Sequence, residues 1–148
     1  MTAVQPDAVL QAPVDAMDGV SARPDFAVLL YPVLTMQAPF DTTHAKQQLL
    51  GGHPTQAARD ALSVELHVDA RTPPMFIAQA RDDPIAPPEN SVLMAAALRR
   101  AGVPVELHQF QHGGHGWGLG KPGSEPAAWP QLLLAWLRSH GWMPQPAG

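Results

Sequence analysis

Two short apolar runs along the chain predict buried β-strands. Residues 26–31 (Phe-Ala-Val-Leu-Leu-Tyr) end at Pro32, and residues 75–80 (Met-Phe-Ile-Ala-Gln-Ala) follow Pro73 and Pro74. Continuous apolar runs of this length, bounded by proline, are typical of strands that are covered on both faces in a parallel sheet. We therefore expect both segments to lie inside an α/β sheet.

A third strand is predicted from Val105 to Phe110, after Pro104. In this segment Val105 and Leu107 alternate with polar residues. The alternation favours a strand near the edge of the sheet, since one face is then less completely covered.

Helical spacing and capping residues predict four helices around these strands. Two short ones run from Thr42 or Thr43 to Leu50 and from Thr55 to about Ser63, each with a threonine at its start. A longer helix ends at Gly102; Glu89 and Asn90 are expected to start it, and its apolar face contains Met94, Ala95, Leu98 and Ala101.

The final helix is predicted from Ala127 to His140. Its apolar stripe contains Trp129, Leu132, Leu133, Trp136 and Leu137. At this spacing the two tryptophans are expected to belong to the core rather than to a sugar-binding platform.

The order of these elements indicates a parallel α/β sheet, because strands and helices alternate. Residues 1–22 are predicted to be an irregular N-terminal segment, residues 23–142 the α/β domain and residues 143–148 a loose tail.

Composition narrows the function classes. The chain has 148 residues, 45% of them hydrophobic, which suits one globular domain. A net charge of −4 and scattered basic residues argue against nucleic acid or an anionic membrane as a partner. The absence of cysteine excludes a disulfide, a thiolate nucleophile and a thiolate metal site. With no signal peptide or transmembrane run in this sequence, a cytoplasmic protein is expected as the chain is written.

The candidate chemistry lies just after the second and third strands. Asp83 follows the second strand in Asp-Pro-Ile-Ala-Pro, and His115 follows the third in Gly-Gly-His-Gly-Trp-Gly-Leu. Loops at the carboxyl ends of neighbouring parallel strands meet at one edge of the sheet. We therefore expect Asp83 to orient the imidazole of His115, as the acid orients the base in nucleophilic acyl transfer.

Simpler interpretations remain open for single residues. Asp83 taken alone is equally a turn residue, and His115 a solvated loop histidine. The cluster of His108, His112 and His115 has no nearby carboxylate that would complete a metal site, so no metal is expected. Trp117 is expected either to wall a substrate pocket or to pack within its loop.

Residues 20–142 resemble the C-terminal half of an α/β-hydrolase, in particular the acetylxylan-esterase-like and dienelactone-hydrolase-like esterases. The matching stretches are residues 22–33, 82–91, 102–108 and 113–119, followed by the final helix. The resemblance implies hydrolysis of a carboxylic ester, such as an acetyl ester of a carbohydrate, without a cofactor. It implies that Asp83 is the acid and His115 the base, and that Asp82 is the less suitable acid.

The nucleophile of that family is missing from this sequence. No Gly-x-Ser-x-Gly is present among the five serines, and Ser21, the first in chain order, has no flanking glycines and no preceding strand. His112-Gly113-Gly114 follows the wrong strand to be the family's oxyanion loop.

Two readings follow from this absence. The chain is either part of a serine esterase whose nucleophile lies elsewhere, in its own protein or in a partner, or an inactive truncated fragment. In either case the strand at 26–31 is expected to present an unpaired edge through which the chain self-associates.

Overall fold

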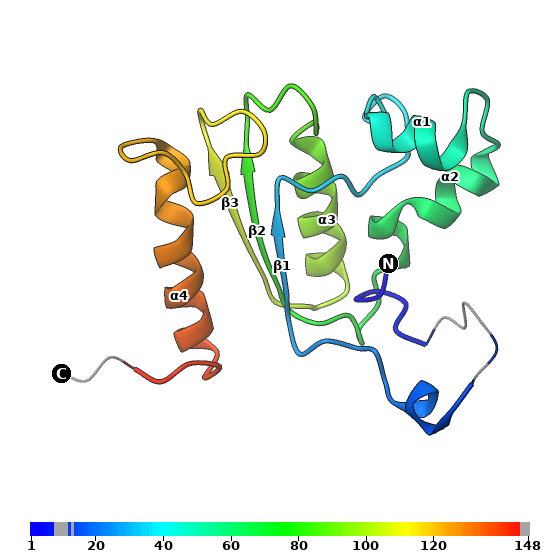
Figure 1. Ribbon diagram of the computed structural model, residues 1–148, viewed down its shortest axis with the longest axis horizontal. Helices are drawn as coiled ribbons and strands as arrows, with labels where there is room; N and C mark the ends of the chain where they lie inside the picture. The colour runs from blue at the N-terminus through cyan, green and yellow to red at the C-terminus, as the bar shows by residue number, and fades with distance from the viewer. Residues whose placement is uncertain (8–11, 13, 146–148) are drawn as a thin grey trace.

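The computed structural model describes residues 1–7, 12 and 14–145, and its centre is a parallel three-stranded sheet (Figure 1). The strands are β1 (Ala27–Leu30), β2 (Met75–Ala80) and β3 (Val105–Phe110), in the spatial order β1-β2-β3. Met75 pairs with Ala27 on one side and with Val105 on the other. The predicted parallel α/β architecture and all three strands are confirmed.

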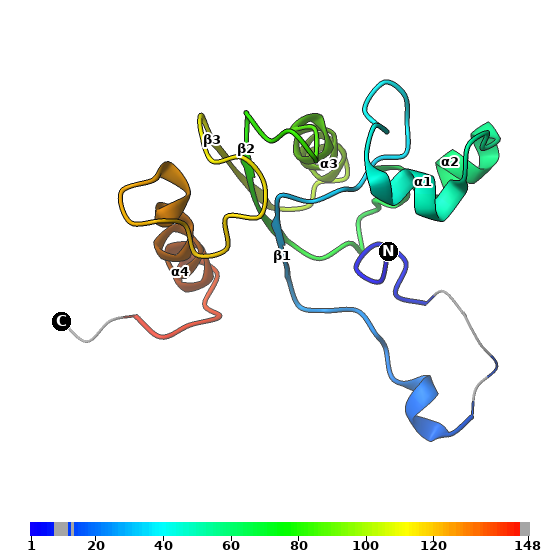
Figure 2. The same ribbon diagram turned by 45° about the horizontal axis from the view of Figure 1, so that its top comes forward.

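One long helix covers each face of the sheet, as Figures 1 and 2 show: α3 (Glu89–Arg100) on one side and α4 (Trp129–Ser139) on the other. Because side chains alternate along a strand, Met75 and Ile77 of β2 pack with the aliphatic residues of α3. Phe76 and Ala78 pack instead in an aromatic cluster with Trp136 of α4. The predicted apolar stripe of the last helix therefore belongs to the core.

β2 and β1 differ in burial, although the sequence predicts both to be covered on two faces. Every residue of β2 is buried, whereas the four residues of β1 are only partly buried. The prediction was wrong for β1 because, within the described residues, this strand has β2 on one side and no strand on the other.

The chain between β1 and β2 forms two short helices, α1 (His44–Leu50) and α2 (Gln56–Leu62). Thr43 and Thr55 cap them by accepting hydrogen bonds from the backbone N–H of Lys46 and Ala58. Both caps confirm the sequence prediction. Neither helix has a buried residue, so apolar packing contributes little to holding them in place.

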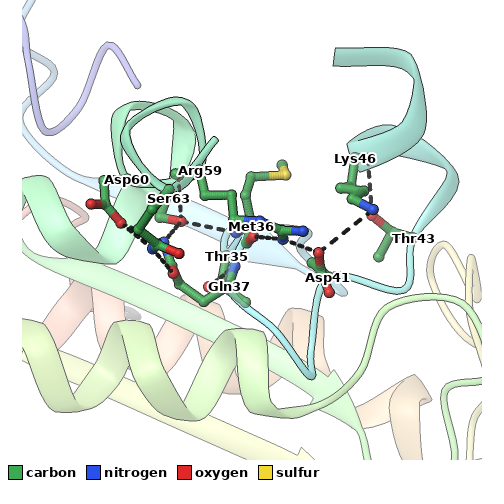
Figure 3. A network of polar contacts seen from close by, with 10 residues as sticks. Thr35, Met36, Gln37, Asp41, Thr43, Lys46, Arg59, Asp60 and Ser63 are labelled. Carbon is green, nitrogen blue, oxygen red and sulfur yellow. Dashed lines mark hydrogen bonds and ion pairs between the residues drawn. The ribbon is translucent and has the colours of Figure 1, made fainter. Parts of the chain in front are cut away.

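A polar network attaches this helical segment to the loop that follows β1 (Figure 3). Arg59 of α2 donates to the carbonyl of Met36 and forms an ion pair with Asp41. The hydrogen bond from Arg59 and the charges of Arg59 and Lys46 lower the pKa of Asp41. Ser63 donates to the carbonyl of Arg59 and accepts from the N–H of Met36.

Three short 3-10 helices complete the structure: η1 (Ala16–Gly19), η2 (Val64–His67) and η3 (Glu125–Ala128). η3 occupies the start of the segment predicted as the last helix, so α4 begins two residues later than expected. Val4, in the segment predicted to be irregular, is buried in the core on the α3 side. Among the described residues, the helices are too short or too polar to cross a membrane. The predicted tail at 143–148 is described only as far as residue 145.

Candidate active site

The loops after β2 and β3 lie side by side at the carboxyl edge of the sheet (Figure 1), and they bring Asp83 and His115 into contact. Nδ1 of His115 lies 2.8 Å from Oδ2 of Asp83. The side chain of Asp83 is completely buried, while 26% of the His115 side chain is exposed. The two residues that the sequence singles out are therefore hydrogen-bonded, with the carboxylate inside the protein and the imidazole at its surface.

The acid loop, residues 81–88, surrounds the carboxylate of Asp83 with donors. The backbone N–H groups of Ile85 and Ala86 donate to Oδ1, at 2.8 and 2.9 Å. Nε2 of Gln79 donates to Oδ2 at 2.9 Å. Both oxygens are therefore held by groups other than His115.

The bond between Asp83 and His115 also defines which nitrogen carries the proton. A carboxylate oxygen only accepts, so Nδ1 of His115 is the donor in this bond. Nε2 of a neutral His115 is then left with a lone pair that can accept a proton. This is the arrangement that a general base requires.

Asp82 has a different partner from Asp83. Its Oδ1 accepts hydrogen bonds from the backbone N–H groups of Gly113 and Gly114, at 2.9 and 2.8 Å. The hydrogen bond from the N–H of Gly114 is the largest cause that lowers the pKa of Asp82. Desolvation opposes it, and the N–H of Gly113 and the side chain of His112 add smaller lowering effects, so the net shift of the pKa is downward. Asp82 thus ties the acid loop to the base loop and does not contact the imidazole of His115.

The base loop, residues 111–123, is fixed at two further points. The carboxylate of Glu125 accepts from the N–H of Gln111 at 2.6 Å, and the indole N–H of Trp129 donates to the carbonyl of Gly118 at 2.8 Å. Gly113 allows the close packing, because a Cβ there would lie 2.6 Å from the Pro126 ring. The loop is therefore attached to η3 and α4 as well as to the acid loop.

The ring of Tyr31 packs against the imidazole of His115. The ring of Tyr31, at the end of β1, makes edge contacts with His115 and Trp117, with centroid distances of 4.9 and 4.8 Å. The backbone of Tyr31 has φ 41°, in the left-handed region that residues other than glycine seldom adopt. A strained residue thus lies directly against the candidate base.

Trp117 packs against other rings and also lines a hollow beside His115. Its ring contacts Phe110 and Trp129 as well as Tyr31. It also lines a hollow of about 320 Å³ beside His115, together with Gly113, Gly116, Lys121, Ser124 and Pro126. Its indole N–H is buried without a hydrogen-bond partner.

Among the described residues no serine is hydrogen-bonded to His115, although Ser124 lines the hollow beside it. Ser63 and Ser91 are buried and hydrogen-bonded elsewhere, and Ser124 and Ser139 donate to nearby carbonyls. Ser21 precedes β1, so it lies toward the amino ends of the parallel strands, opposite to His115. Within the described residues, His115 has no hydrogen bond to a hydroxyl group.

The other histidines do not assemble a metal site. His108 hydrogen-bonds to Glu106 at 2.6 Å, and His112 lies 3.4 Å from Asp82. No group of three or more potential ligands of suitable geometry occurs in the part of the chain that the structure describes.

Three residues near the site were not predicted from the sequence in their structural roles: Gln79, Tyr31 and Asn90. Asn90 does lie in the first turn of α3, as expected, but its Oδ1 accepts from the N–H groups of Leu34 and Thr35. A polar residue in an otherwise apolar strand was the available signal for Gln79. Nothing in the sequence around Tyr31 or Asn90 indicated the contacts that these residues make.

A parallel sheet with helices on both faces and a hydrogen-bonded Asp–His pair on consecutive strand ends is the arrangement expected in the C-terminal half of an α/β-hydrolase. The chain belongs to the prolyl oligopeptidase family, whose profile matches residues 21–141. This match confirms the α/β-hydrolase fold, and the relatives described next confirm the resemblance to esterases.

Among known relatives, the chain is 41% identical over 99 residues to endo-1,4-beta-xylanase B of Butyrivibrio fibrisolvens, covering 66% of this chain and 15% of that protein. It is 29% identical over 142 residues to an acetylxylan esterase of Xylanibacter ruminicola, covering 88% of this chain and 28% of that protein. The chain thus spans less than a third of the length of these two relatives.

Solved structures agree with this assignment. An acetyl ester-xyloside bifunctional hydrolase from Caldicellulosiruptor lactoaceticus superimposes with a TM-score of 0.84 at 38% identity, covering 97% of this chain and 53% of that chain. A carboxylesterase from Lactobacillus plantarum WCFS1 gives a TM-score of 0.66 at 31% identity, over 82% of this chain and 46% of its own length. This chain corresponds to about half of each of these hydrolases.

Proposed function

We propose that this chain supplies the acid and the base of a serine esterase that removes acetyl groups from xylose-based carbohydrates. The observation that carries the proposal is the 2.8 Å hydrogen bond between Nδ1 of His115 and the buried carboxylate of Asp83. The names of the similar proteins, an acetylxylan esterase and an acetyl ester-xyloside hydrolase, support the choice of substrate.

In the proposed reaction a serine hydroxyl attacks the ester carbonyl. Nε2 of His115 takes the hydroxyl proton and then delivers it to the departing sugar oxygen, while Asp83 stabilises the positively charged imidazole. Water repeats the sequence on the acyl-enzyme and releases acetate. Trp117 is proposed to wall the pocket for the ester, since it lines the hollow beside His115.

The nucleophile in this proposal comes from a segment outside the 148 residues, on the same protein or on a partner. The open side of β1 is where we expect that segment to pair. Ala27 and Tyr31 donate their N–H groups to Pro74 and Ala78 of the β2 side. Because donors alternate along a strand, the N–H groups of Val28 and Leu30 point to the open side.

A chimera tests the proposal. In it, this chain replaces the matching half of the Caldicellulosiruptor hydrolase, which it covers over 53% of the length. We expect the chimera to release acetate from acetylated xylo-oligosaccharides and from 4-nitrophenyl acetate. His115→Ala should lower kcat by on the order of 10³-fold or more, because general acid–base catalysis is lost. His53→Ala is the matched control, since His53 is an exposed turn residue.

Three results would contradict the proposal. A chimera whose activity survives His115→Ala would show that another group is the base. Turnover by the isolated chain that disappears in His115→Ala would show that no outside serine is needed. If instead the chimera folds and is inactive on every ester, the alternative of an inactive fragment is favoured. Light scattering of the isolated chain then reports whether β1 pairs with a second copy.

A further inference from the structure

A second buried polar group lies behind Asp83. Gln79 is the fifth residue of β2, and its side chain is completely buried in a strand that is otherwise apolar. A buried amide is costly unless its N–H and C=O groups are bonded. Its partners therefore show why a glutamine is accommodated there.

Every partner of Gln79 belongs to the acid loop, its own strand or α3. Nε2 lies 2.9 Å from Oδ2 of Asp83 and 3.2 Å from the carbonyl oxygen of Ala86. Oε1 accepts from the hydroxyl of Ser91 at 3.0 Å. Since the carboxylate and the carbonyl only accept, the NH₂ end of the amide must face them. The orientation of the amide is thus determined by its surroundings.

Gln79 and His115 share one oxygen of the acid. Both donate to Oδ2 of Asp83, and the backbone N–H groups of Ile85 and Ala86 hold Oδ1. Rotation about the Cβ–Cγ bond of Asp83 moves both oxygens together, so donors on Oδ1 and donors on Oδ2 all resist it. Gln79 fixes the second oxygen from the protein side, independently of His115.

We infer that Gln79 is a positioning residue that aims Oδ2 of Asp83 at His115, and that Ser91 in turn holds Gln79. This inference rests on the proposed function for its catalytic meaning, but the hydrogen bonds exist with or without turnover. Without Gln79, the bond from Nδ1 of His115 to Asp83 persists in only part of the molecules. The proton of neutral His115 then redistributes from Nδ1 to Nε2, which removes the lone pair that a general base uses.

The test is ¹⁵N NMR of the His115 imidazole in the full chain, which reports the tautomer and the exchange rate of the Nδ1 proton with water. In Gln79→Met, which keeps the length of the side chain and removes both polar ends, we expect a shift toward the Nε2–H tautomer. We also expect Nδ1–H exchange to be faster by about tenfold or more, the factor that corresponds to losing one hydrogen bond to a charged group. Ser91→Ala should move both readouts in the same direction by a smaller factor.

The matched control is Gln109→Met. Gln109 is the register partner of Gln79 on β3, and it is not among the hydrogen-bond partners of Asp83 or His115. A merely structural loss in the sheet would affect both variants, whereas the positioning role predicts a change only with Gln79.

An unchanged tautomer and exchange rate in a folded Gln79→Met variant would overturn the inference. If that variant does not fold, Ser91→Ala decides: faster exchange supports the role of Gln79, and unchanged exchange overturns it. Because these readouts need no ester, a chimera without esterase activity contradicts the proposed function and leaves the positioning role to be judged by NMR alone.

Discussion

The acid loop and the base loop differ in how they are built, although each contributes one residue to the same pair. Asp83 is completely buried and is held by two backbone N–H groups and by Gln79 before His115 is counted. His115 is partly exposed, and within the described residues its hydrogen bond is to Asp83 alone. Its loop is attached at the sides, through Asp82 and Trp129.

Because of this difference, we expect substitutions of Asp83 and of His115 to affect the stability of the fold to different extents. Asp83 is part of the interior, so its removal is expected to disturb the fold as well as the site. His115 is carried on an attached but exposed loop, so its removal is expected to disturb the chemistry with little effect on the fold. Each variant below is chosen to break or sharpen that contrast.

The largest effect is expected from Asp83→Ala. This change removes the acceptor of the backbone N–H groups of Ile85 and Ala86 and the nearest acceptor of Gln79, so it should lower the free energy of unfolding by about 3–5 kcal/mol. Urea denaturation followed by tryptophan fluorescence measures it. Asp83→Asn, which keeps an acceptor for the two backbone N–H groups, should lose less. A loss of stability equal to that of His115→Ala would remove the contrast between the loops.

A smaller and local effect, loss of the hydrogen bonds from the N–H groups of Gly113 and Gly114, is expected when Asp82 is protonated as the pH falls. Hydrogen bonding lowers its pKa, with the N–H of Gly114 as the largest cause. The stabilisation of the folded state by ionised Asp82 is therefore complete above the ordinary aspartate pKa of about 3.9. It is lost as the pH falls through the lowered pKa that Asp82 has in the folded protein. The amide resonances of Gly113 and Gly114 should titrate with a midpoint below 3.9. In Asp82→Asn that titration should be absent; a midpoint at or above the ordinary value would contradict the tie between the loops.

The smallest effect on stability is expected from His115→Ala. Asp83 keeps three donors in this variant, and the imidazole is at the surface, so the free energy of unfolding should change by less than about 1 kcal/mol. Thermal unfolding compared with His53→Ala measures it. A cooperative transition at an unchanged temperature would support the contrast, whereas a loss of several kcal/mol would show that the base is as much a part of the fold as the acid.

Much of this structure could be predicted from periodic patterns. The apolar run at 75–80 predicted β2 with both its bounds, and the spacing of Leu132, Leu133 and Trp136 predicted the face of α4 that is buried. Asp83 and His115 were placed together because the carboxyl ends of neighbouring parallel strands coincide. These inferences need only the regular geometry of strands and helices.

The supporting residues could not be predicted in the same way. The bond from Gln79 to Asp83 depends on the course of an irregular turn, and the contact of Tyr31 with His115 depends on a left-handed backbone angle that no residue pattern specified. The partial exposure of β1 is not encoded in its own apolar composition; it follows from the unpaired edge that the missing half of the fold already predicted. Local patterns thus identified the pair and left its surroundings to tertiary structure.

The register of β2 has a consequence for how this chain tolerates insertions. Met75, Ile77 and Gln79 occupy odd-numbered positions and share one face of the strand, where Gln79 meets Ser91 of α3. A single inserted or deleted residue between Met75 and Gln79 would reverse the parity and turn the amide toward the aromatic side of α4. The strand should therefore tolerate insertions or deletions only of an even number of residues. The exposed turns before β1 and after α1 are free to vary in length.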